Sequence, residues 1–408
     1  MILDFSIGNY RSLYKIQTLN FRATSLVSED KTLDSNNIVE TEGGRILKAI
    51  GIYGPNGSGK SNLVKGLRIF RNLVEGSLVS ETIMDDAAEP FKLTSEKGAD
   101  SGFFQIQLLI DQRKYRYGFT LQPGGAVLQE WLFGPAEKNE TWYFKRSEAT
   151  VETNKEWFEE AYSLPFDKLR SNTLFLTFVS AYNGQVAQSI RNFITRRISF
   201  QNVSSKGRII VGISSTRSTN RLIKEGRADL VLEWLKSAGL VYSGINVEDI
   251  DNFVERVLLE KNIFDKFGKA TGKVQLDLDK NESAGTKKFY GFIGTLYQMF
   301  SRGGVLVSDE IDNNFHPSLL QQFIRFFNDP DINKAGAQLV FTSHDTNLMQ
   351  PDILRRDQIY FTEKSHADET ILYSLADLKG IRNNADFARQ YLAGFYGALP
   401  LLEKYKQD

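Results

Sequence analysis

The sequence contains no cysteine and only three histidines among its 408 residues. The absence of cysteine excludes disulfide bonds and thiolate-ligated metal sites, as is typical of cytoplasmic proteins. With so few histidines, a conventional His-ligated metal centre is not expected. No apolar run approaches the ~20 residues that a transmembrane helix needs, and the N-terminus lacks the features of a secretory signal. The composition therefore predicts a soluble, cytoplasmic protein without membrane contact.

The chain also lacks a net charge, because 50 basic residues balance 50 acidic ones. The segment Val186–Arg227 departs from this balance, with nine basic residues against one acid, Glu225. Such a segment predicts contact with the phosphates of a nucleic acid or with an acidic protein surface. The alternative is a solvated face balanced in space by acids such as Asp85, Asp86 and Glu89. The basic residues are Arg191, Arg196, Arg197, Lys206, Arg208, Arg217, Arg221, Lys224 and Arg227.

A glycine-rich loop, Gly54-Pro-Asn-Gly-Ser-Gly-Lys-Ser61, follows the apolar run Ala49–Tyr53. Its glycines let backbone N–H groups converge on a polyphosphate, and the helix expected from about Lys60 directs its positive end to the same place. Lys60 is expected to neutralise the β- and γ-phosphates, and the Ser61 hydroxyl to ligate Mg²⁺. The residues expected to bind the nucleotide here are Asn56, Gly57, Ser58, Gly59, Lys60, Ser61 and Asn62.

Two adjacent carboxylates follow a second short apolar strand, Val305–Ser308. Ligands of α/β sheets gather at the carboxyl ends of the strands, so these side chains are expected beside the phosphates. Asp309 suits the Mg²⁺ shell, and Glu310 is placed to orient or deprotonate the water that attacks the γ-phosphorus. His344 follows the next strand, Gln338–Ser343, and is placed to donate to the γ-phosphate. A solvated strand end and a structural histidine are the alternatives.

The segment Glu282-Ser-Ala-Gly-Thr286 opens a helix with an apolar face. Ser283 is placed to cap this helix, which is the commonest use of serine at such a position. A helix N-terminus with a hydroxyl residue and a glycine, here Gly285, is also an anion-binding surface. Because the glycine-rich loop already holds the phosphates of its own nucleotide, Ser283 and Gly285 are expected to serve the nucleotide of another subunit.

The pattern of strands and helices predicts three parts. Residues 1–150 and 271–408 alternate strands and helices, which predicts a largely parallel sheet. Residues 151–270 indicate a mainly helical insertion, with amphipathic segments such as Leu230–Lys236 and Val247–Leu258. The predicted fold is therefore α/β, a P-loop nucleotide-binding head with a mixed sheet and an antiparallel β-subdomain, interrupted by an inserted mainly helical domain.

The antiparallel β-subdomain is predicted from alternating apolar residues. Phe104–Ile110 and Tyr115–Phe119 form a hairpin, and strands near Val127–Phe133 and Trp142–Lys145 extend it. The segment 28–45 is polar and indicates a loop.

These motifs occur in a fixed order over residues 1–150 and 270–408, and together they resemble the ATP-binding-cassette heads of SMC and OLD (overcoming lysogenization defect) type ATPases. The stretches that carry the resemblance are Asn9-Tyr-Arg-Ser12, the glycine-rich loop, Glu282–Thr286, Val305–Glu310 with Asn314-Phe-His-Pro317, and Thr342-Ser-His344. Three further spans look like the AbiL/RloA branch of bacterial anti-phage ATPases: Phe327–Asn333, Leu354–Ile359 and Tyr391–Gly397. The ATPase of the PARIS defence system is a more distant resemblance.

The resemblance implies a head that binds ATP and Mg²⁺, hydrolyses ATP and forms a dimer, or a higher oligomer, around two nucleotides. It implies that Ser283 and Gly285 form the signature that closes over the γ-phosphate of a partner's ATP, and that His344 is the switch histidine. It also implies that Arg11 reaches the nucleotide, although an exposed arginine without this role is an equal alternative. His316 falls in the loop through which such heads contact the opposite subunit.

The chain departs from related families in three places. The signature lacks the leading Leu and the second Gly of the transporter form, which favours the SMC/OLD side. Gln105 and Gln107 are candidates for a glutamine loop that the sequence does not place. OLD proteins usually carry a Toprim nuclease after the head, whereas only about sixty residues follow His344 here. Any nuclease is therefore expected on a separate chain.

Three functions fit these features. The first is an ATP-hydrolysing sensor or regulator of a bacterial anti-phage, abortive-infection system that controls a separately encoded effector, a Toprim-like nuclease being one candidate. The second is a nucleotide-dependent scaffold that sequesters a toxin or nuclease with little turnover. The third is an SMC-like ATPase of DNA repair or maintenance that binds nucleic acid through Val186–Arg227.

Overall fold

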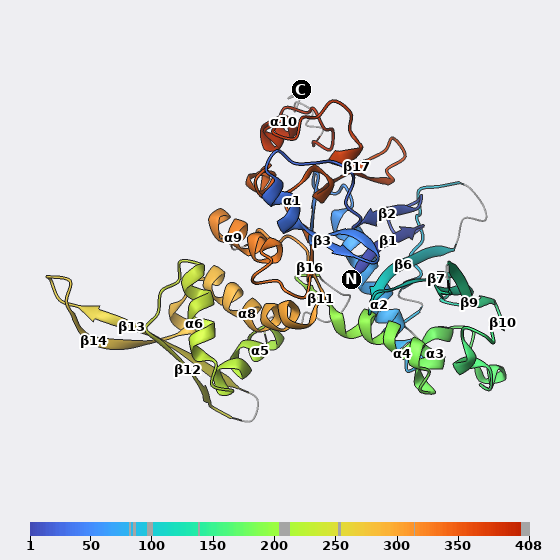
Figure 1. Ribbon diagram of the computed structural model, residues 1–408, viewed down its shortest axis with the longest axis horizontal. Helices are drawn as coiled ribbons and strands as arrows, with labels where there is room; N and C mark the ends of the chain where they lie inside the picture. Colours follow the sequence, from blue (N-terminus) through green and yellow to red (C-terminus); the bar gives the residue numbers. More distant parts are fainter. Residues whose placement is uncertain are drawn as a thin grey trace, which may run out of the picture.

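The computed structural model describes most of the chain and shows a body built around two large sheets, from which a narrow third sheet projects (Figure 1). The described residues are 1–80, 83–84, 87–95, 101–137, 139–203, 213–251, 254–313 and 315–400.

The central sheet has six strands in the order β11-β15-β16-β5-β17-β18. Neighbouring strands run parallel, except that β18 runs antiparallel to β17. Strands β5 and β16 are buried at every residue, as expected for a parallel sheet covered on both faces. The prediction of a largely parallel sheet is confirmed. Its strands are β5 (Ala49–Tyr53), β11 (Ile198–Gln201), β15 (Val305–Ser308), β16 (Gln338–Thr342), β17 (Ile359–Lys364) and β18 (Thr370–Ser374).

Two clusters of buried side chains cover the opposite faces of this sheet. Val305 and Val307 belong to one cluster and Leu306 to the other, because successive side chains of a strand point to opposite faces. Helix α2 (Lys60–Gly76) contributes to the first cluster. Helices α8 (Ala284–Arg302) and α9 (Pro317–Asn328) contribute to the second. Helix α2 begins at Lys60 and α8 directly after Ser283, as the sequence predicts.

The second sheet is antiparallel, has seven strands in the order β10-β9-β8-β7-β6-β1-β2 and packs against α2. The predicted hairpin is confirmed as β6 and β7, joined at Asp111 and Gln112 with φ of 48° and 62°. The predicted strands after it are confirmed as β8 and β9. The strands are β1 (Ile2–Gly8), β2 (Gln17–Asn20), β6 (Gly102–Ile110), β7 (Arg113–Leu121), β8 (Val127–Pro135), β9 (Glu140–Ser147) and β10 (Thr150–Thr153).

The segment 28–45 contains a short helix and most of a hairpin, so the prediction of a loop is wrong. Asp30 caps α1 (Lys31–Asn37) by accepting a hydrogen bond from the Thr32 N–H at 2.8 Å. Strands β3 (Ile38–Thr41) and β4 (Gly44–Leu47) follow. Elements of four to seven residues are too short to show a clear hydrophobic period.

The segment 151–270 differs from the predicted mainly helical insertion, although the three-part division itself stays a prediction. Leu230–Lys236 lies in α6, as predicted. Strand β11, however, joins the central sheet, and the described residues of Val247–Leu258 lie in β12, β13 and the chain next to these strands instead of in a helix. Val247, Ile250, Val254 and Val257 follow helical spacing, but Val247 and Val257 pair directly across the hairpin. The helices here are α3 (Phe175–Ala181), α4 (Gln185–Asn192), α5 (Ile213–Lys224) and α6 (Ala228–Ser237).

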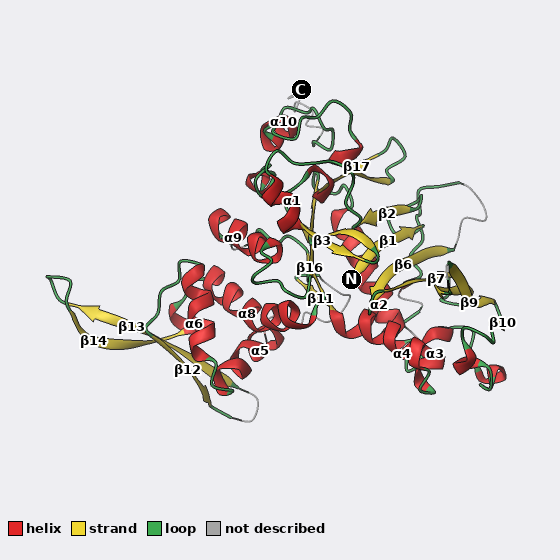
Figure 2. Cartoon of the chain, viewed as in Figure 1, coloured by secondary structure: helices red, strands yellow, loops and turns green. Residues whose placement is uncertain are grey.

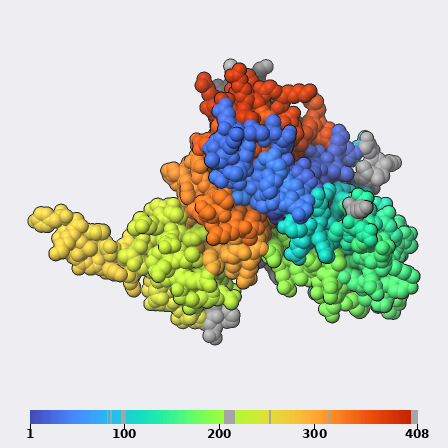
Figure 3. All heavy atoms as spheres, in the orientation of Figure 1, coloured from blue at the N-terminus to red at the C-terminus, as the bar shows by residue number. Residues whose placement is uncertain are grey.

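A narrow three-stranded sheet, β12-β13-β14, projects from the body, on the side away from the seven-stranded sheet (Figure 2). Strand β12 (Gly244–Asp249) pairs with β13 (Glu255–Phe264) only as far as Glu260. Beyond that residue, β13 and β14 (Ala270–Asp277) continue as a two-stranded ribbon. The space-filling view shows this ribbon as a thin gold projection (Figure 3). Helix α7 (Leu278–Asn281) connects β14 to the start of α8.

Candidate nucleotide-binding site

The glycine-rich loop connects β5 to α2 at the carboxyl end of the central sheet. Gly54, Gly57 and Gly59 have φ of 145°, 79° and 111°, which L side chains rarely adopt. A Cβ atom on Gly59 would lie 2.0 Å from Thr370 Oγ1, and one on Gly54 would lie 2.3 Å from the Thr362 carbonyl oxygen. The loop therefore needs glycine both for its conformation and for its close approach to β17 and β18.

The Lys60 ammonium lies against the inside of this loop. Its Nζ atom donates hydrogen bonds to the carbonyl oxygens of Gly54 at 2.7 Å and Pro55 at 3.1 Å. Burial lowers the pKa of Lys60, and nearby carboxylates, the largest effect being that of Asp309, oppose this shift. The positive charge of Lys60 is thus held within reach of both the loop and the carboxylates.

Ser61 and Asp309 lie together, as predicted for a pair of Mg²⁺ ligands. The Ser61 hydroxyl donates to Asp309 Oδ1 at 3.2 Å, and the Thr342 hydroxyl donates to the same oxygen at 2.6 Å. Mg²⁺ takes oxygen ligands and is usually held by one or two protein groups together with water and phosphate oxygens. Two oxygen-bearing side chains at the loop therefore fit this ion. Within the described residues, no three His, Asp or Glu side chains gather to hold a metal by themselves.

Glu310 is held in an unusual backbone conformation at the end of β15. Its φ is 46°, and its N–H donates to Thr342 Oγ1 at 2.7 Å. Its carboxylate oxygen Oε2 accepts a hydrogen bond of 2.6 Å from the side-chain amide of Asn313. Residues other than glycine that adopt such a positive φ cluster at functional sites, where the surrounding structure holds them in place.

A cavity of about 190 Å³ brings the sequence-predicted residues together. The side chains of Glu310 and His344 line it opposite the loop, so three segments far apart in the sequence meet there. The His344 N–H donates to Asp312 Oδ2 at 3.2 Å, which fixes the start of the loop after β16. The lining residues are Pro55, Asn56, Gly57, Gly59, Lys60, Ser61, Asn62, Glu310 and His344.

A family model described as "AAA domain, putative AbiEii toxin, Type IV TA system" matches residues 50–350. The chain belongs to this AAA family. The match spans the glycine-rich loop, the Asp309–Glu310 pair and His344, and it identifies the protein as a nucleotide-binding domain of the AAA type. No curated protein sequence matches the chain.

Solved structures similar to this AAA domain include three SMC heads. The SMC head domain from Thermotoga maritima is 12% identical, with 91% of this chain and 98% of that chain covered and a TM-score of 0.42. The Smc head domain with an extended coiled coil bound to the C-terminal domain of ScpA, derived from Pyrococcus furiosus, is 11% identical, with 97% and 99% covered and a TM-score of 0.45. The Smc head domain with a coiled coil and joint derived from Pyrococcus yayanosii is 10% identical, with the same coverage and TM-score.

Two predicted residues of the AAA domain lie outside the cavity on the same chain. Ser283 is exposed and caps α8, as predicted, with its hydroxyl accepting from the Thr286 N–H at 3.2 Å. Gly285 follows in the first turn of the same helix. Neither residue lines the cavity around Lys60, and their role toward another subunit stays a prediction.

Arg11 lies beside the glycine-rich loop but not in its cavity. Its guanidinium pairs with Glu89 at 2.8 Å, in a neighbouring hollow of about 300 Å³. The adjacent Ser12 accepts hydrogen bonds from Asn62 at 2.7 Å and from Thr370 at 2.8 Å, which links this region to the loop. Contact between Arg11 and a nucleotide stays a prediction.

The side chains of Ser58 and His316 are used for local structure. The Ser58 hydroxyl is buried and lies 2.6 Å from Thr362 Oγ1, so it supports the loop from behind. His316 caps α9, with Nδ1 accepting from the Ser318 N–H at 3.3 Å. The neighbouring Asn314, which belongs to the same sequence motif, lies outside the described residues.

Most of the described basic side chains in Val186–Arg227 are engaged within the protein. Arg191 donates to the carbonyl oxygens of Val74 at 3.3 Å and Glu75 at 2.8 Å. Further ion pairs and hydrogen bonds join Arg197 to Arg302, Arg221 to Glu225, Lys224 to Asp249 and Glu255, and Arg227 to Tyr297. Lys206 and Arg208 lie outside the described residues, as do the acids Asp85 and Asp86.

Sequence reasoning missed the polar residues that hold the carboxylates in place. Thr342 was part of a recognised motif without an assigned role, yet it contacts both Asp309 and Glu310. Asn313 follows Glu310 by three residues, and only the turn after β15 brings its amide back to the carboxylate. The spacing of these residues carries no signal that could be recognised without the fold.

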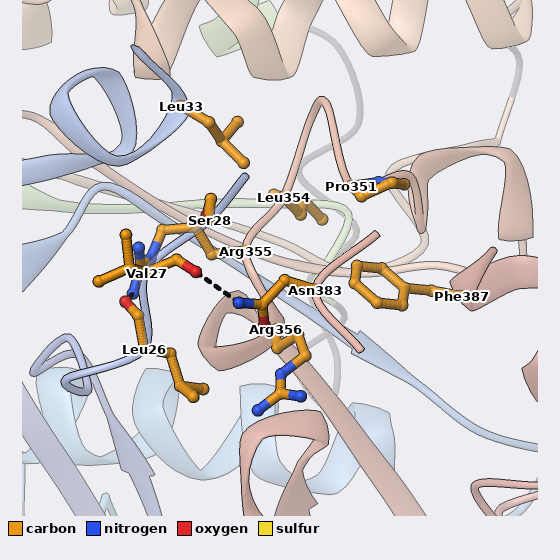
Figure 4. Close-up of a pocket in the computed structure, with 10 residues that line it drawn as sticks. All are labelled: Leu26, Val27, Ser28, Leu33, Pro351, Leu354, Arg355, Arg356, Asn383 and Phe387. Carbon is orange, nitrogen blue, oxygen red and sulfur yellow. Dashed lines mark hydrogen bonds between the residues drawn. The ribbon is translucent and has the colours of Figure 1, made fainter. Parts of the chain in front are cut away.

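A second cavity lies between the N-terminal segment and the C-terminal part of the chain (Figure 4). Its volume is about 10 Å³, which is room for about one water molecule. The side-chain amide of Asn383 donates across it to the Val27 carbonyl oxygen. The cavity is a small gap where the two segments pack together, and it is too small for a nucleotide.

No helix in the described ranges is both long enough and apolar enough to cross a lipid bilayer.

Proposed function

We propose that this AAA protein hydrolyses ATP between two copies of itself. The observation that carries the proposal is the single cavity in which Lys60 of the glycine-rich loop faces Glu310 and His344. The cavity thus combines a cation for the phosphates, a carboxylate to position the attacking water and an imidazole close to both. Catalysis of phosphoryl transfer depends on such positioning and electrostatic stabilisation.

In this proposal each side chain has one task. Lys60 exchanges its hydrogen bonds with the loop carbonyls for bonds to the β- and γ-phosphates of the substrate. Glu310, oriented by Asn313, positions and deprotonates the attacking water. Ser61 and Asp309 would hold Mg²⁺, which neutralises charge on the phosphate oxygens when it is bound.

The second copy supplies the other side of the nucleotide. Ser283 is exposed and Gly285 half-buried at the N-terminus of α8, a 19-residue helix whose positive end favours a phosphate. We infer that they close over the γ-phosphate bound at the partner's loop. This arrangement explains why α8 begins with a serine and a glycine although neither residue lines the cavity around Lys60 of the same chain.

The test compares two substitutions of the full chain. Lys60→Ala is expected to abolish ATP binding, whereas Glu310→Gln is expected to bind ATP, lose about 100-fold or more of its turnover and accumulate as a dimer. Glu137→Gln, the same change at an exposed site of the β-subdomain, is the control. Phosphate release and light scattering after gel filtration measure both properties. Wild-type turnover of Glu310→Gln would overturn the catalytic assignment.

We further propose that this ATPase is a cytoplasmic regulator of a bacterial anti-phage system and controls a separately encoded effector. The family description, which refers to an abortive-infection toxin, and the spans that resemble anti-phage ATPases support this role. Cells carrying the gene with its neighbouring reading frame should survive or abort phage infection differently when Lys60 is changed to Ala. The absence of any wild-type turnover would instead support a nucleotide-dependent scaffold.

A further inference from the structure

The ribbon formed by β13 and β14 beyond Glu260 is the most exposed part of the described chain. We call residues Lys261–Lys273 the arm. Within it the two strands pair with each other, and no other strand of the described residues pairs with either edge (Figures 2 and 3). A two-stranded ribbon is too thin to bury a core of its own, so the side chains on both of its faces are exposed to solvent.

The arm is basic on both faces. It contains four lysines and a single acid, Asp265. Lys273 pairs across the ribbon with Asn262 and therefore shares its face, whereas Lys261, the residue before Asn262, points to the other face. Lys266 and Lys269 lie around the turn at the tip. Of these charges, Lys273 pairs with Glu260 at the root of the arm, at 3.0 Å.

The tip of the arm also exposes large apolar side chains. Phe267 is 83% exposed, Phe264 59% and Ile263 46%. The Lys266 ammonium lies 4.9 Å from the centre of the Phe267 ring. Exposed apolar groups that gather in one place mark a surface that meets another molecule.

We propose that the arm inserts into a groove of duplex DNA. The major groove admits a two-stranded ribbon and presents phosphates on both of its walls, which matches lysines on both faces of the arm. Proteins that bind the minor groove insert apolar side chains between base steps, and the tip of the arm carries side chains of this kind. A membrane or a flat acidic protein would meet only one face of the ribbon, and the lysine on the other face would then contribute nothing to binding.

The proposal moves the nucleic-acid contact away from the segment Val186–Arg227. Five of the described basic side chains there already have hydrogen bonds or ion pairs within the protein: Arg191, Arg197, Arg221, Lys224 and Arg227. The inference goes beyond the proposed ATPase function and does not depend on it.

The experiment measures binding of the full chain, without nucleotide, to a fluorescent 40-base-pair duplex at several salt concentrations. The double variant Lys266→Glu/Lys269→Glu is expected to bind at least 10-fold more weakly. The slope of log affinity against log salt should become shallower by about 2, because each lost phosphate contact removes ~0.9. The control is Lys168→Glu/Lys334→Glu, which makes the same change of charge at exposed sites outside the arm and should bind as the wild type does.

A second variant separates the aromatic contribution from the charge. Phe264→Ala/Phe267→Ala should weaken duplex binding several-fold and leave the salt slope unchanged, since it removes no charge. Thermal unfolding verifies that each variant is folded.

Four results would overturn the proposal: no duplex binding by the wild type at low salt, equal losses in the arm and control variants, tighter binding of the single strand than of the duplex, or arm-dependent binding to anionic phospholipid vesicles without binding to the duplex. ATP turnover, measured separately and without DNA, tests the proposed function alone.

Discussion

The ammonium of Lys288 donates a hydrogen bond of 2.7 Å to the main-chain carbonyl oxygen of Asn313. A second bond of 3.0 Å goes to the carbonyl oxygen of Ile311. Lys288 lies in the second turn of α8, the helix that Ser283 caps, and Asn313 donates its side-chain amide to Glu310. The helix proposed to meet the partner's ATP is thus bonded to the loop that holds the carboxylate proposed to act on water.

Removing the Lys288 ammonium should therefore impair hydrolysis more than binding. Lys288→Met keeps the length of the side chain but frees the carbonyl oxygens of Ile311 and Asn313, so the loop after Glu310 loses its support. We expect turnover to fall about 10-fold while the affinity for ATP changes less than 3-fold. Phosphate-release kinetics and binding of a fluorescent ATP analogue measure the two effects.

Lys287→Met is the matched control for this prediction. Lys287 is adjacent in the sequence, but its ammonium bonds to the Asp279 carbonyl oxygen on the exposed side, away from the loop. It should hydrolyse ATP at nearly the wild-type rate. Equal losses in both variants would contradict the proposed role of Lys288.

The Thr342 hydroxyl should matter for catalysis although it does not line the cavity. It donates to Asp309 and accepts from the Glu310 N–H, so Thr342→Val leaves that N–H without a partner in the protein. We expect turnover to fall about 10- to 100-fold and stability to fall by about 1–3 kcal/mol. Thr342→Ser keeps the hydroxyl and should retain most of the activity. Steady-state kinetics and denaturant unfolding of both variants provide the comparison; an active Thr342→Val enzyme would count against this role.

Stability should rise with pH in a mildly alkaline range. Burial lowers the pKa of Lys48 and of Lys288 from the usual 10.5 to about 8. Between these values the unfolded chain binds more protons than the folded one, so the free energy of unfolding increases with pH, by at most about 1.4 kcal/mol per pH unit for each lysine. Below pH 8 both states are protonated and this dependence disappears.

Lys48→Met isolates one of these two contributions. Lys48 is 3% exposed and donates to the Asn328 carbonyl oxygen at 3.3 Å. The variant should show a smaller gain in stability than the wild type between pH 8 and 9.5. Lys334→Met, at an exposed position, should follow the wild type. Urea unfolding at several pH values measures the slopes, and identical slopes for Lys48→Met and the wild type would refute the assignment.

The sequence predicted the parts of the fold whose residues interact locally or by simple burial. Strands β5, β15 and β16 are short apolar runs, and the loop after β5 has a spacing that only a phosphate site explains. The position of the Asp309–Glu310 pair beside that loop followed from the rule that parallel strands end at the same edge.

What the sequence did not predict depends on tertiary contacts. The bond between Lys288 and Asn313 joins residues 25 positions apart, and no spacing rule connects a helix lysine to a turn. The hairpin of β12 and β13 was mistaken for a helix because Val247, Ile250, Val254 and Val257 follow helical spacing, and only the pairing of Val247 with Val257 reveals the strands.

Helix α7 connects β14, one of the two strands of the arm, to the edge that the partner's ATP is proposed to meet. Strand β14 ends at Asp277, and Ser283 follows after a single turn of helix and Glu282. At the root of the arm the Lys261 ammonium lies 4.9 Å from the ring centre of Tyr242, whose hydroxyl is bonded to Glu282. A molecule that binds the arm would therefore act on Ser283 through α7 and through the contacts of Tyr242. The two binding events would be linked. If dimerisation over ATP increases the affinity of the arm for DNA by some factor, DNA bound to the arm must favour dimerisation by the same factor.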